Sequence, residues 1–276
     1  MDSDLTNLEP APGQVAPPVS LRLVVMPTEH GGWSFLGEPI LLGLLVAPSW
    51  AGMLIALGAV AAFLARQPLK LLVSDRRRGK IYPRTRVADR AFGVLVVVAA
   101  GAVGGATWMT AARFWPAVAA ATPLAALALA FDLDKRSREA AGELSGALAL
   151  GAVATTVALA GGWRTAPAFA LWGVLASRAV PTILYVRARL RREKGQPAGI
   201  AGALAAHGVA IGAVALLAAR GLVPWAAAGA MIVLAVRAAL MLSPRRPRLK
   251  TWQLGVSEVG FGLLVVLSAA LARGRA

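Results

Sequence analysis

The sequence contains no cysteine, only two histidines, and 13 acidic residues against 29 lysines and arginines. Without cysteine the chain can form no disulfide and no thiolate metal site, and it has no cysteine nucleophile. Charged residues make up 15% of the chain, whereas soluble domains carry about 25%. Hydrophobic residues make up 58%. This composition excludes an ordinary soluble domain and predicts a protein whose main solvent is lipid.

Most of the positive charge lies in four segments that alternate with nearly uncharged connections. The basic segments are 66–90, 135–138, 187–194 and 245–250, and the connections carry Arg113, Arg164 and Arg220. The apolar stretches between them are about as long as a bilayer is thick, roughly 20 residues. This is the positive-inside pattern, which places the basic segments in the cytoplasm. The net charge of +16 is therefore assigned to contact with membrane lipids, not with nucleic acid.

The apolar stretches predict an all-α fold: a polytopic integral membrane helical bundle of about nine transmembrane helices. The predicted spans are 33–47, 49–67, 91–111, 115–131, 143–162, 167–186, 200–219, 223–242 and 252–272. The polar, Pro-rich residues 1–24 are expected to form a flexible cytoplasmic tail, and residues 25–276 a single transmembrane domain. Nine spans place the N-terminus inside and the C-terminus outside.

Ionisable residues inside the predicted spans all lie toward the cytoplasmic ends. A charge inside a bilayer is costly, so such residues normally face the bundle interior and mark function. Glu38 and Glu258 each need a partner, and Arg178 and Arg237 are the available counter-charges. Pro39 is expected to break the first helix and free backbone groups. Together these features predict a polar cavity that opens to the cytoplasm.

Candidate site residues follow from this one-sided placement. The candidate catalytic or positioning residues are Glu29, His30 and Glu38. The candidate substrate-binding residues are Arg66, Gln67, Lys70, Arg84, Arg86, Arg178, Tyr185, Arg187, His207 and Glu258. The basic members could hold a phosphate or diphosphate, because guanidinium groups bind such anions bidentately. The alternative to phosphate binding is that the basic loops form a solvated surface that contacts lipid headgroups.

The entry to the first span, Pro27-Thr28-Glu29-His30-Gly31-Gly32-Trp33, resembles the P-x-E/Q-H-G-A-W opening of the YwiC-like bacterial membrane proteins. Three further segments resemble that family: Arg66-Gln67-Pro68-Leu69, residues 143–149, and residues 177–187. The resemblance covers most of residues 25–200 and implies a location in the bacterial cytoplasmic membrane. It implies no particular activity.

A second segment, Pro83-Arg84-Thr85-Arg86, is similar to the P-R-T-x-R-P segment of UbiA-type prenyltransferases, which are nine-span bundles with a cytoplasm-facing cavity. This resemblance implies binding or transfer of a prenyl or lipid diphosphate. The metal-binding N-D-x-x-D motif of that superfamily is absent, and Gln67, Pro68 and Lys70 occupy the comparable stretch. Magnesium therefore lacks its usual carboxylate ligands, and basic residues would have to stabilise the diphosphate charge.

Three functions stay open on the sequence alone: a transferase acting on a prenyl or lipid diphosphate, a membrane transporter, and a non-catalytic lipid-binding scaffold subunit. No Walker loop, dinucleotide fingerprint, HExxH or GxSxG pattern is present to indicate another enzyme class. A transporter would need polar residues through the full thickness of the membrane or matched broken helices in both halves. The confinement of polar residues to one side favours the transferase over the transporter.

Overall fold

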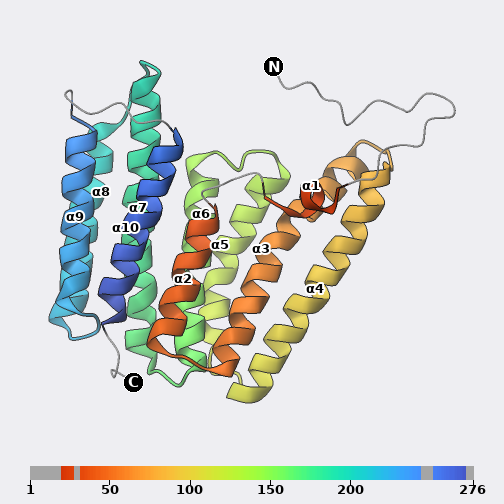
Figure 1. Cartoon of the computed structure of the whole chain (residues 1–276), viewed down its shortest axis with the longest axis horizontal. Coiled ribbons are helices and arrows are strands. Elements are labelled where there is room, and N and C mark those ends of the chain that lie inside the picture. The colour runs from red at the N-terminus through yellow and green to blue at the C-terminus, as the bar shows by residue number, and fades with distance from the viewer. Residues whose placement is uncertain (1–19, 28–31, 244–250, 272–276) are drawn as a thin grey trace.

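The computed structural model describes residues 20–27, 32–243 and 251–271, and these residues are helical with no β-strand among them (Figure 1). The helices, in chain order, are α1 (Leu21–Val25), α2 (Gly32–Val46), α3 (Trp50–Arg77), α4 (Pro83–Thr110), α5 (Trp115–Leu133), α6 (Ala140–Ala160), α7 (Thr165–Glu193), α8 (Ile200–Ala219), α9 (Trp225–Met241) and α10 (Thr251–Ala270). The predicted all-α class is confirmed.

Among the described residues, seven helices are long and apolar enough to cross a membrane: α3 to α8, and α10 from Trp252. The apolar helices α2 and α9 are shorter, at 15 and 17 residues. Helices α2 to α10 lie where the nine spans are predicted. A multi-span helical membrane bundle is therefore confirmed, and the number of spans stays a prediction.

Two local features differ from the sequence prediction. Helix α2 continues through Pro39, so the expected break of the first span is wrong. Membrane helices tolerate proline where neighbouring helices and local adjustment satisfy the freed backbone groups. At the junction of the predicted tail, Leu21–Val25 forms helix α1. Its Val24 is buried against Leu72 of α3 and Ala88 of α4.

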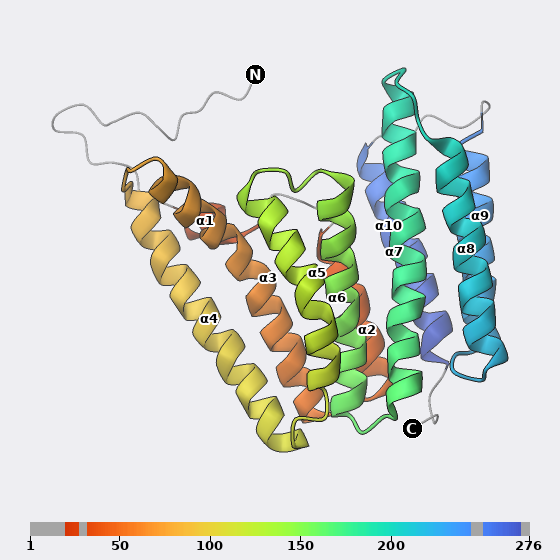
Figure 2. The same cartoon turned by 180° about the vertical axis from the view of Figure 1, so that it is seen from behind.

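The bundle has two parts that lie side by side. Helices α1 to α6 form one part, with α4 at its outer edge, and α7 to α10 form the other (Figures 1 and 2). Helix α6 packs against α7, and α2 packs against α10, so these two contacts join the parts. Helices α2 and α6 approach closely at Gly43, where an added Cβ would lie 2.7 Å from Val157 Cβ. Such small-residue contacts let membrane helices pack without a hydrophobic driving force.

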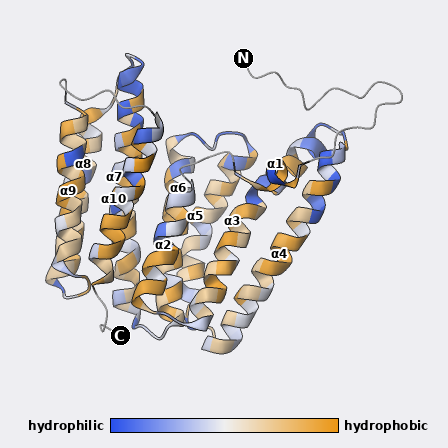
Figure 3. Ribbon diagram, viewed as in Figure 1, coloured by the Kyte–Doolittle hydropathy of each residue, from blue (hydrophilic) through white to orange (hydrophobic). Residues whose placement is uncertain are grey.

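The two ends of the bundle differ in polarity. The α3–α4, α5–α6 and α7–α8 turns carry the basic segments and lie together at one end, which we call the basic end (Figure 3). The fourth basic segment, 245–250, lies outside the described residues. The largest buried apolar cluster extends toward the opposite end, where Phe114, Trp163 and Val223 are buried. Outward valines of α4 such as Val97, 71% exposed, fit a lipid-facing surface.

Candidate functional site

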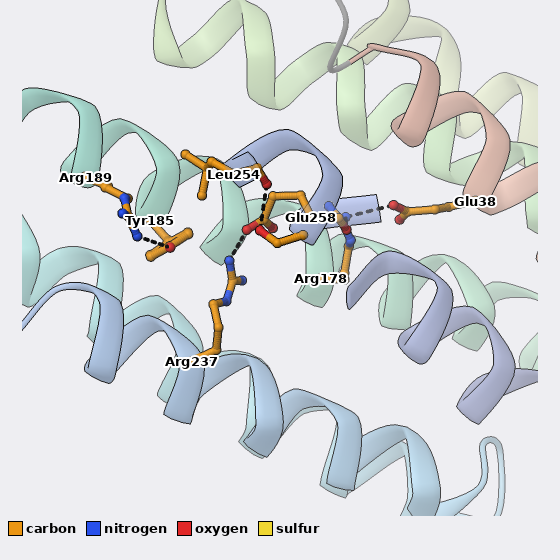
Figure 4. Close-up of polar contacts among 8 residues, drawn as sticks. Glu38, Arg178, Tyr185, Arg189, Arg237, Leu254 and Glu258 are labelled. Atoms are coloured by element: carbon orange, nitrogen blue, oxygen red, sulfur yellow. Dashed lines mark hydrogen bonds and ion pairs between the residues drawn. The ribbon is translucent and has the colours of Figure 1, made fainter. Parts of the chain in front are cut away.

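Four charged side chains from four helices form a buried ion network. Its members are Glu38 of α2, Arg178 of α7, Arg237 of α9 and Glu258 of α10 (Figure 4). Arg178 Nη2 lies 2.8 Å from Glu38 Oε1 and donates a hydrogen bond to the Glu258 carbonyl oxygen at 3.0 Å. Arg237 Nη1 forms an ion pair with the Glu258 carboxylate. The predicted counter-charges of both glutamates are therefore confirmed.

Helix α10 lies directly over the Glu38–Arg178 pair because residue 262 is glycine. A Cβ at Gly262 would overlap Glu38 Oε1, and it would lie 2.6 Å from Glu38 Cδ and 2.9 Å from Arg178 Nη2. Side chains in close-packed interiors cannot accept such an overlap without displacement. Glycine at this position thus lets α2, α7 and α10 meet around one buried ion pair.

Helix α7 carries a buried polar stripe. The stripe residues, spaced by three or four positions, are Arg178, Thr182, Tyr185 and Arg189. Arg189 Nη1 donates a hydrogen bond to the Tyr185 hydroxyl at 3.3 Å. The Arg237 guanidinium carbon lies 4.1 Å from the centroid of the Tyr185 ring and 4.8 Å from that of Phe261. Two aromatic faces therefore hold this guanidinium in place through cation–π contacts.

His207 of α8 is buried, and its Nδ1 lies 2.8 Å from the Ala203 carbonyl oxygen. Several buried polar atoms around it and around the ion network have no hydrogen-bond partner among the described residues. They are Arg178 Nε, Arg237 Nε, Arg237 Nη2, Glu258 Oε2, His207 Nε2 and Thr182 Oγ1. Buried polar atoms normally have partners, and leaving one unsatisfied costs about 1–3 kcal/mol. These atoms therefore have hydrogen-bonding capacity that the described residues do not use.

A second group of charges, which we call the α3–α5 cluster, consists of Arg66, Lys70 and Asp132. Arg66 and Lys70 lie one helical turn apart on α3, and both reach Asp132 at the end of α5. Arg66 Nε donates to Asp132 Oδ2 at 2.8 Å, and Lys70 Nζ lies 3.6 Å from Asp132 Oδ1. The Asp132 side chain is buried, whereas those of Arg66 and Lys70 are 32% and 26% exposed. Two partly exposed cations are thus anchored on one buried carboxylate.

Other predicted residues occupy separate contacts at the basic end. Arg84 Nη2 donates to Asp75 Oδ1 at 3.1 Å, and Thr85 Oγ1 donates to Asp75 Oδ2 at 2.7 Å. Asp75 is fully buried, so this contact fastens the start of α4 to the end of α3. Arg86 is exposed. The Arg84 side chain is therefore engaged within the α3–α4 hairpin.

Arg187 also has a partner at the basic end. Its Nη1 lies 2.8 Å from Glu143 Oε2 and donates to the Arg138 carbonyl oxygen, also at 2.8 Å. Gln67 is partly buried beside Arg66 on α3, and Glu29 and His30 lie outside the described residues. The structure thus brings Glu38, Arg178, Tyr185 and Glu258 together. It places Arg66 beside Lys70, and it places Arg84 and Arg187 in separate ion pairs. The functional roles of all these residues stay predictions.

Sequence reasoning missed Asp75, Asp132 and Gly262 as organising residues. Asp132 is an aspartate at the end of an apolar helix, and such a carboxylate needs a cation from a neighbouring helix when it is buried. Asp75 lies only nine residues before Arg84, across a short turn. The close approach at Gly262 has no signal in a single sequence, because α10 carries other glycines whose Cβ would meet nothing.

The described part of the chain contains no group of three or more His, Asp or Glu side chains that could hold a metal ion. Asp75 and Asp132, the two buried aspartates at the basic end, already accept hydrogen bonds from arginines. Magnesium coordination favours several oxygen ligands from carboxylates and water. The described residues therefore do not fit a magnesium site of the UbiA type.

The fold and these contacts define a multi-span helical membrane protein with two buried ion pairs between its helices. Residues 26–158 match the family model of the YwiC-like proteins, which confirms that this part of the chain is YwiC-like. The segment 177–187, which carries Arg178 and Tyr185, lies beyond the matched residues. No curated protein and no solved structure matches the chain. The UbiA resemblance stays a prediction.

Proposed function

We propose that this YwiC-like membrane protein binds a prenyl or lipid diphosphate at its basic end, facing the cytoplasm, and that UbiA-like prenyl transfer is the reaction such binding serves. The observation that carries the proposal is the α3–α5 cluster. It presents an arginine and a lysine side by side, partly exposed, on a buried aspartate. A diphosphate is an anion that such paired cations bind well.

Arg66 and Lys70 are better placed to bind an anion than the other predicted arginines of the basic end. Asp132 fixes the direction of the Arg66 guanidinium, and the Phe63 ring centroid lies 5.5 Å from its central carbon. A fixed cation loses less conformational entropy on binding than a free one. Arg84 and Arg187 each share a carboxylate with no second cation among the ion pairs described above, whereas Arg66 and Lys70 lie on the same carboxylate.

The placement of polar groups does not favour transport. The basic turns of the described chain gather at the basic end, and the largest buried cluster of the described residues is apolar and extends toward the opposite end. A transport pathway needs polar groups through the whole thickness. A ligand that approaches from the basic end and leaves on the same side fits this one-sided arrangement.

Without a carboxylate-bound metal, the cations themselves would stabilise charge on the diphosphate. In a prenyl transfer, the bond between the prenyl carbon and the diphosphate oxygen breaks, and the acceptor takes the carbon and loses a proton. Arg66 and Lys70 would bind the leaving diphosphate, an electrostatic role that fixed donors perform well in a water-poor site. Glu38 is proposed as the acid/base residue that takes the proton released by the acceptor.

The test is a binding measurement with purified protein in lipid nanodiscs. Farnesyl diphosphate would be titrated by calorimetry, with magnesium present and with EDTA. We expect binding under both conditions, and a loss of at least about tenfold in affinity, or about 1.4 kcal/mol, in the Arg66→Gln/Lys70→Gln variant.

Arg77→Gln is the matched control, because Arg77 also lies on α3 and contacts an aspartate, Asp134, at 3.2 Å in an exposed pair. Its affinity should stay within about twofold of the wild type, since exposed pairs contribute little. Absence of binding under both conditions would refute the proposal and leave the scaffold or transporter interpretation. Mass spectrometry of products formed with an aromatic acceptor then separates transfer from binding alone.

A further inference from the structure

The ion network of Glu38, Arg178, Arg237 and Glu258 has a binding capacity that its internal contacts do not use. We propose that it binds the headgroup of a zwitterionic phospholipid, one with a phosphate and a primary ammonium group. The phosphate binds Arg237, and the ammonium binds Glu258 and His207. This inference does not rest on the diphosphate proposal, because the groups that bind the headgroup, Arg237, Glu258 and His207, are not those that bind the diphosphate, and the ligand is different.

Arg237 offers one complete edge of its guanidinium group. Glu258 engages Nη1, whereas Nε and Nη2 are buried without a partner among the described residues. The N–H groups of Nε and Nη2 point the same way and form the fork that accepts two oxygens of a phosphate. The guanidinium carbon lies 4.1 Å from the Tyr185 ring centroid and 4.8 Å from that of Phe261, and these contacts leave the hydrogen-bonding capacity of Nε and Nη2 unused.

The same region offers hydrogen-bond acceptors. Glu258 Oε2 is buried without a partner. His207 Nδ1 faces the Ala203 carbonyl oxygen, which can only accept, so Nδ1 carries the proton and a neutral ring presents Nε2 as an acceptor. Nε2 is also buried without a partner, on α8, which packs against α9. An ammonium group donates three hydrogen bonds, so it supplies the kind of donor that each of these acceptors lacks.

Charge balance selects the class of headgroup. The network contains two arginines and two glutamates, so its buried charges already cancel. A headgroup with a net negative charge would leave an uncompensated charge away from water, which is costly. A headgroup that carries one negative and one positive group satisfies donors and acceptors without adding net charge.

The surrounding helices indicate that the ligand comes from the membrane. The network is formed by apolar helices of the bundle, and neighbouring outward residues such as Ile232 and Val259 are about half exposed. Of its four side chains, that of Glu258 is the most exposed, at 12%. A lipid headgroup would therefore approach past α10, with its acyl chains on the apolar outer surface.

The experiment is native mass spectrometry. The protein is mixed in detergent with equal amounts of phosphatidylethanolamine, phosphatidylcholine and phosphatidylglycerol that have the same acyl chains, and the lipids that stay bound after removal of the detergent are identified. Phosphatidylcholine tests the ammonium donors, because its quaternary nitrogen has no N–H. Phosphatidylglycerol tests the charge balance, because it is a net anion. We expect phosphatidylethanolamine to be retained about tenfold better than either of the other two lipids. A tenfold preference corresponds to the contribution of about one hydrogen bond to a charged group.

Arg237→Lys keeps the charge and removes the fork, and should lower phosphatidylethanolamine retention to the level of the other two lipids. Glu258→Gln should remove the preference for phosphatidylethanolamine over phosphatidylcholine. Arg220→Lys, in the α8–α9 turn at the opposite end, should retain the wild-type pattern. Equal retention of the three lipids by the wild-type protein, or a preference for phosphatidylglycerol, overturns the proposal even if a variant fails to fold.

Soluble phosphoethanolamine distinguishes the source of the headgroup. As a competitor at millimolar concentration, it should displace the lipid poorly, since it lacks acyl chains that contact the bundle. Efficient displacement by the soluble compound would contradict a membrane ligand. Retention of no lipid at all would mean that water satisfies these atoms, and would equally overturn the proposal.

Discussion

The α3–α5 cluster leaves its two cations about a quarter to a third exposed over a buried aspartate, whereas the ion network buries cations and carboxylates together between four helices. The first arrangement keeps charge available to a ligand. The second compensates charge internally and leaves particular atoms, not net charge, unsatisfied. The capacity of an arginine in this bundle to bind a ligand therefore depends on the exposure and the partners of its individual nitrogen atoms.

The largest predicted effect concerns the ion network. Arg178→Gln leaves Glu38 buried without its counter-ion, and should lower the free energy of unfolding by about 3–5 kcal/mol. The Glu38→Gln/Arg178→Gln double variant should recover much of this loss, because no uncompensated charge remains. The measurement is unfolding of purified protein in mixed micelles. Arg164→Gln, an exposed loop arginine, is the control, and equal stability of Arg178→Gln and wild type would contradict the burial of this pair.

A smaller effect should follow from Gly262→Ala. The added methyl group overlaps the Glu38–Arg178 pair, and overpacking of this kind costs about 1–3 kcal/mol. Gly260→Ala is a matched control on the same helix, because its Cβ would meet nothing within 4 Å. Since alanine is the better helix former, this control should be unchanged or slightly stabilised. Identical thermal midpoints for the two variants would argue against the close approach of α10.

In the α3–α5 cluster, Asp132→Asn should cost less, about 1–2 kcal/mol, because Arg66 and Lys70 are partly exposed and can be hydrated. Asp134→Asn, which removes the exposed partner of Arg77, should cost well under 1 kcal/mol. Both are read from the same unfolding measurement. A larger loss for Asp132→Asn than for Arg178→Gln would reverse the comparison between the two regions.

The smallest effect is expected at the exposed Arg136–Glu139 pair in the α5–α6 loop. The hydrogen bond from Arg136 holds the pKa of Glu139 below its usual value. A lowered pKa in the folded state stabilises above the usual pKa and loses that contribution as pH falls through the folded value. Arg136→Gln should therefore raise the pKa of Glu139 toward normal, measured by NMR of labelled glutamate. No measurable change in unfolding is expected, because water screens this pair.

Much of this organisation follows from sequence, for identifiable reasons. Hydropathy predicts the apolar helices α2 to α10, and loop charge predicts which ends of them are basic, since both are local properties of the chain. The need to compensate buried charge predicts the partners of Glu38 and Glu258. The Asp132 and Gly262 contacts depend on which helices become neighbours, and hydropathy carries no such information. The predicted break at Pro39 fails because surrounding helices allow α2 to continue through it.

The most direct test of the central claim, that the two regions bind different ligands, is a crossed binding measurement. Farnesyl diphosphate and phosphatidylethanolamine would each be tested against Arg66→Gln/Lys70→Gln and Arg237→Lys in the same nanodisc preparation. We predict that the first variant loses diphosphate binding and keeps lipid selectivity, and that the second does the reverse. If each variant lost both ligands, or if both variants kept both ligands, the α3–α5 cluster and the ion network would not be separate binding sites.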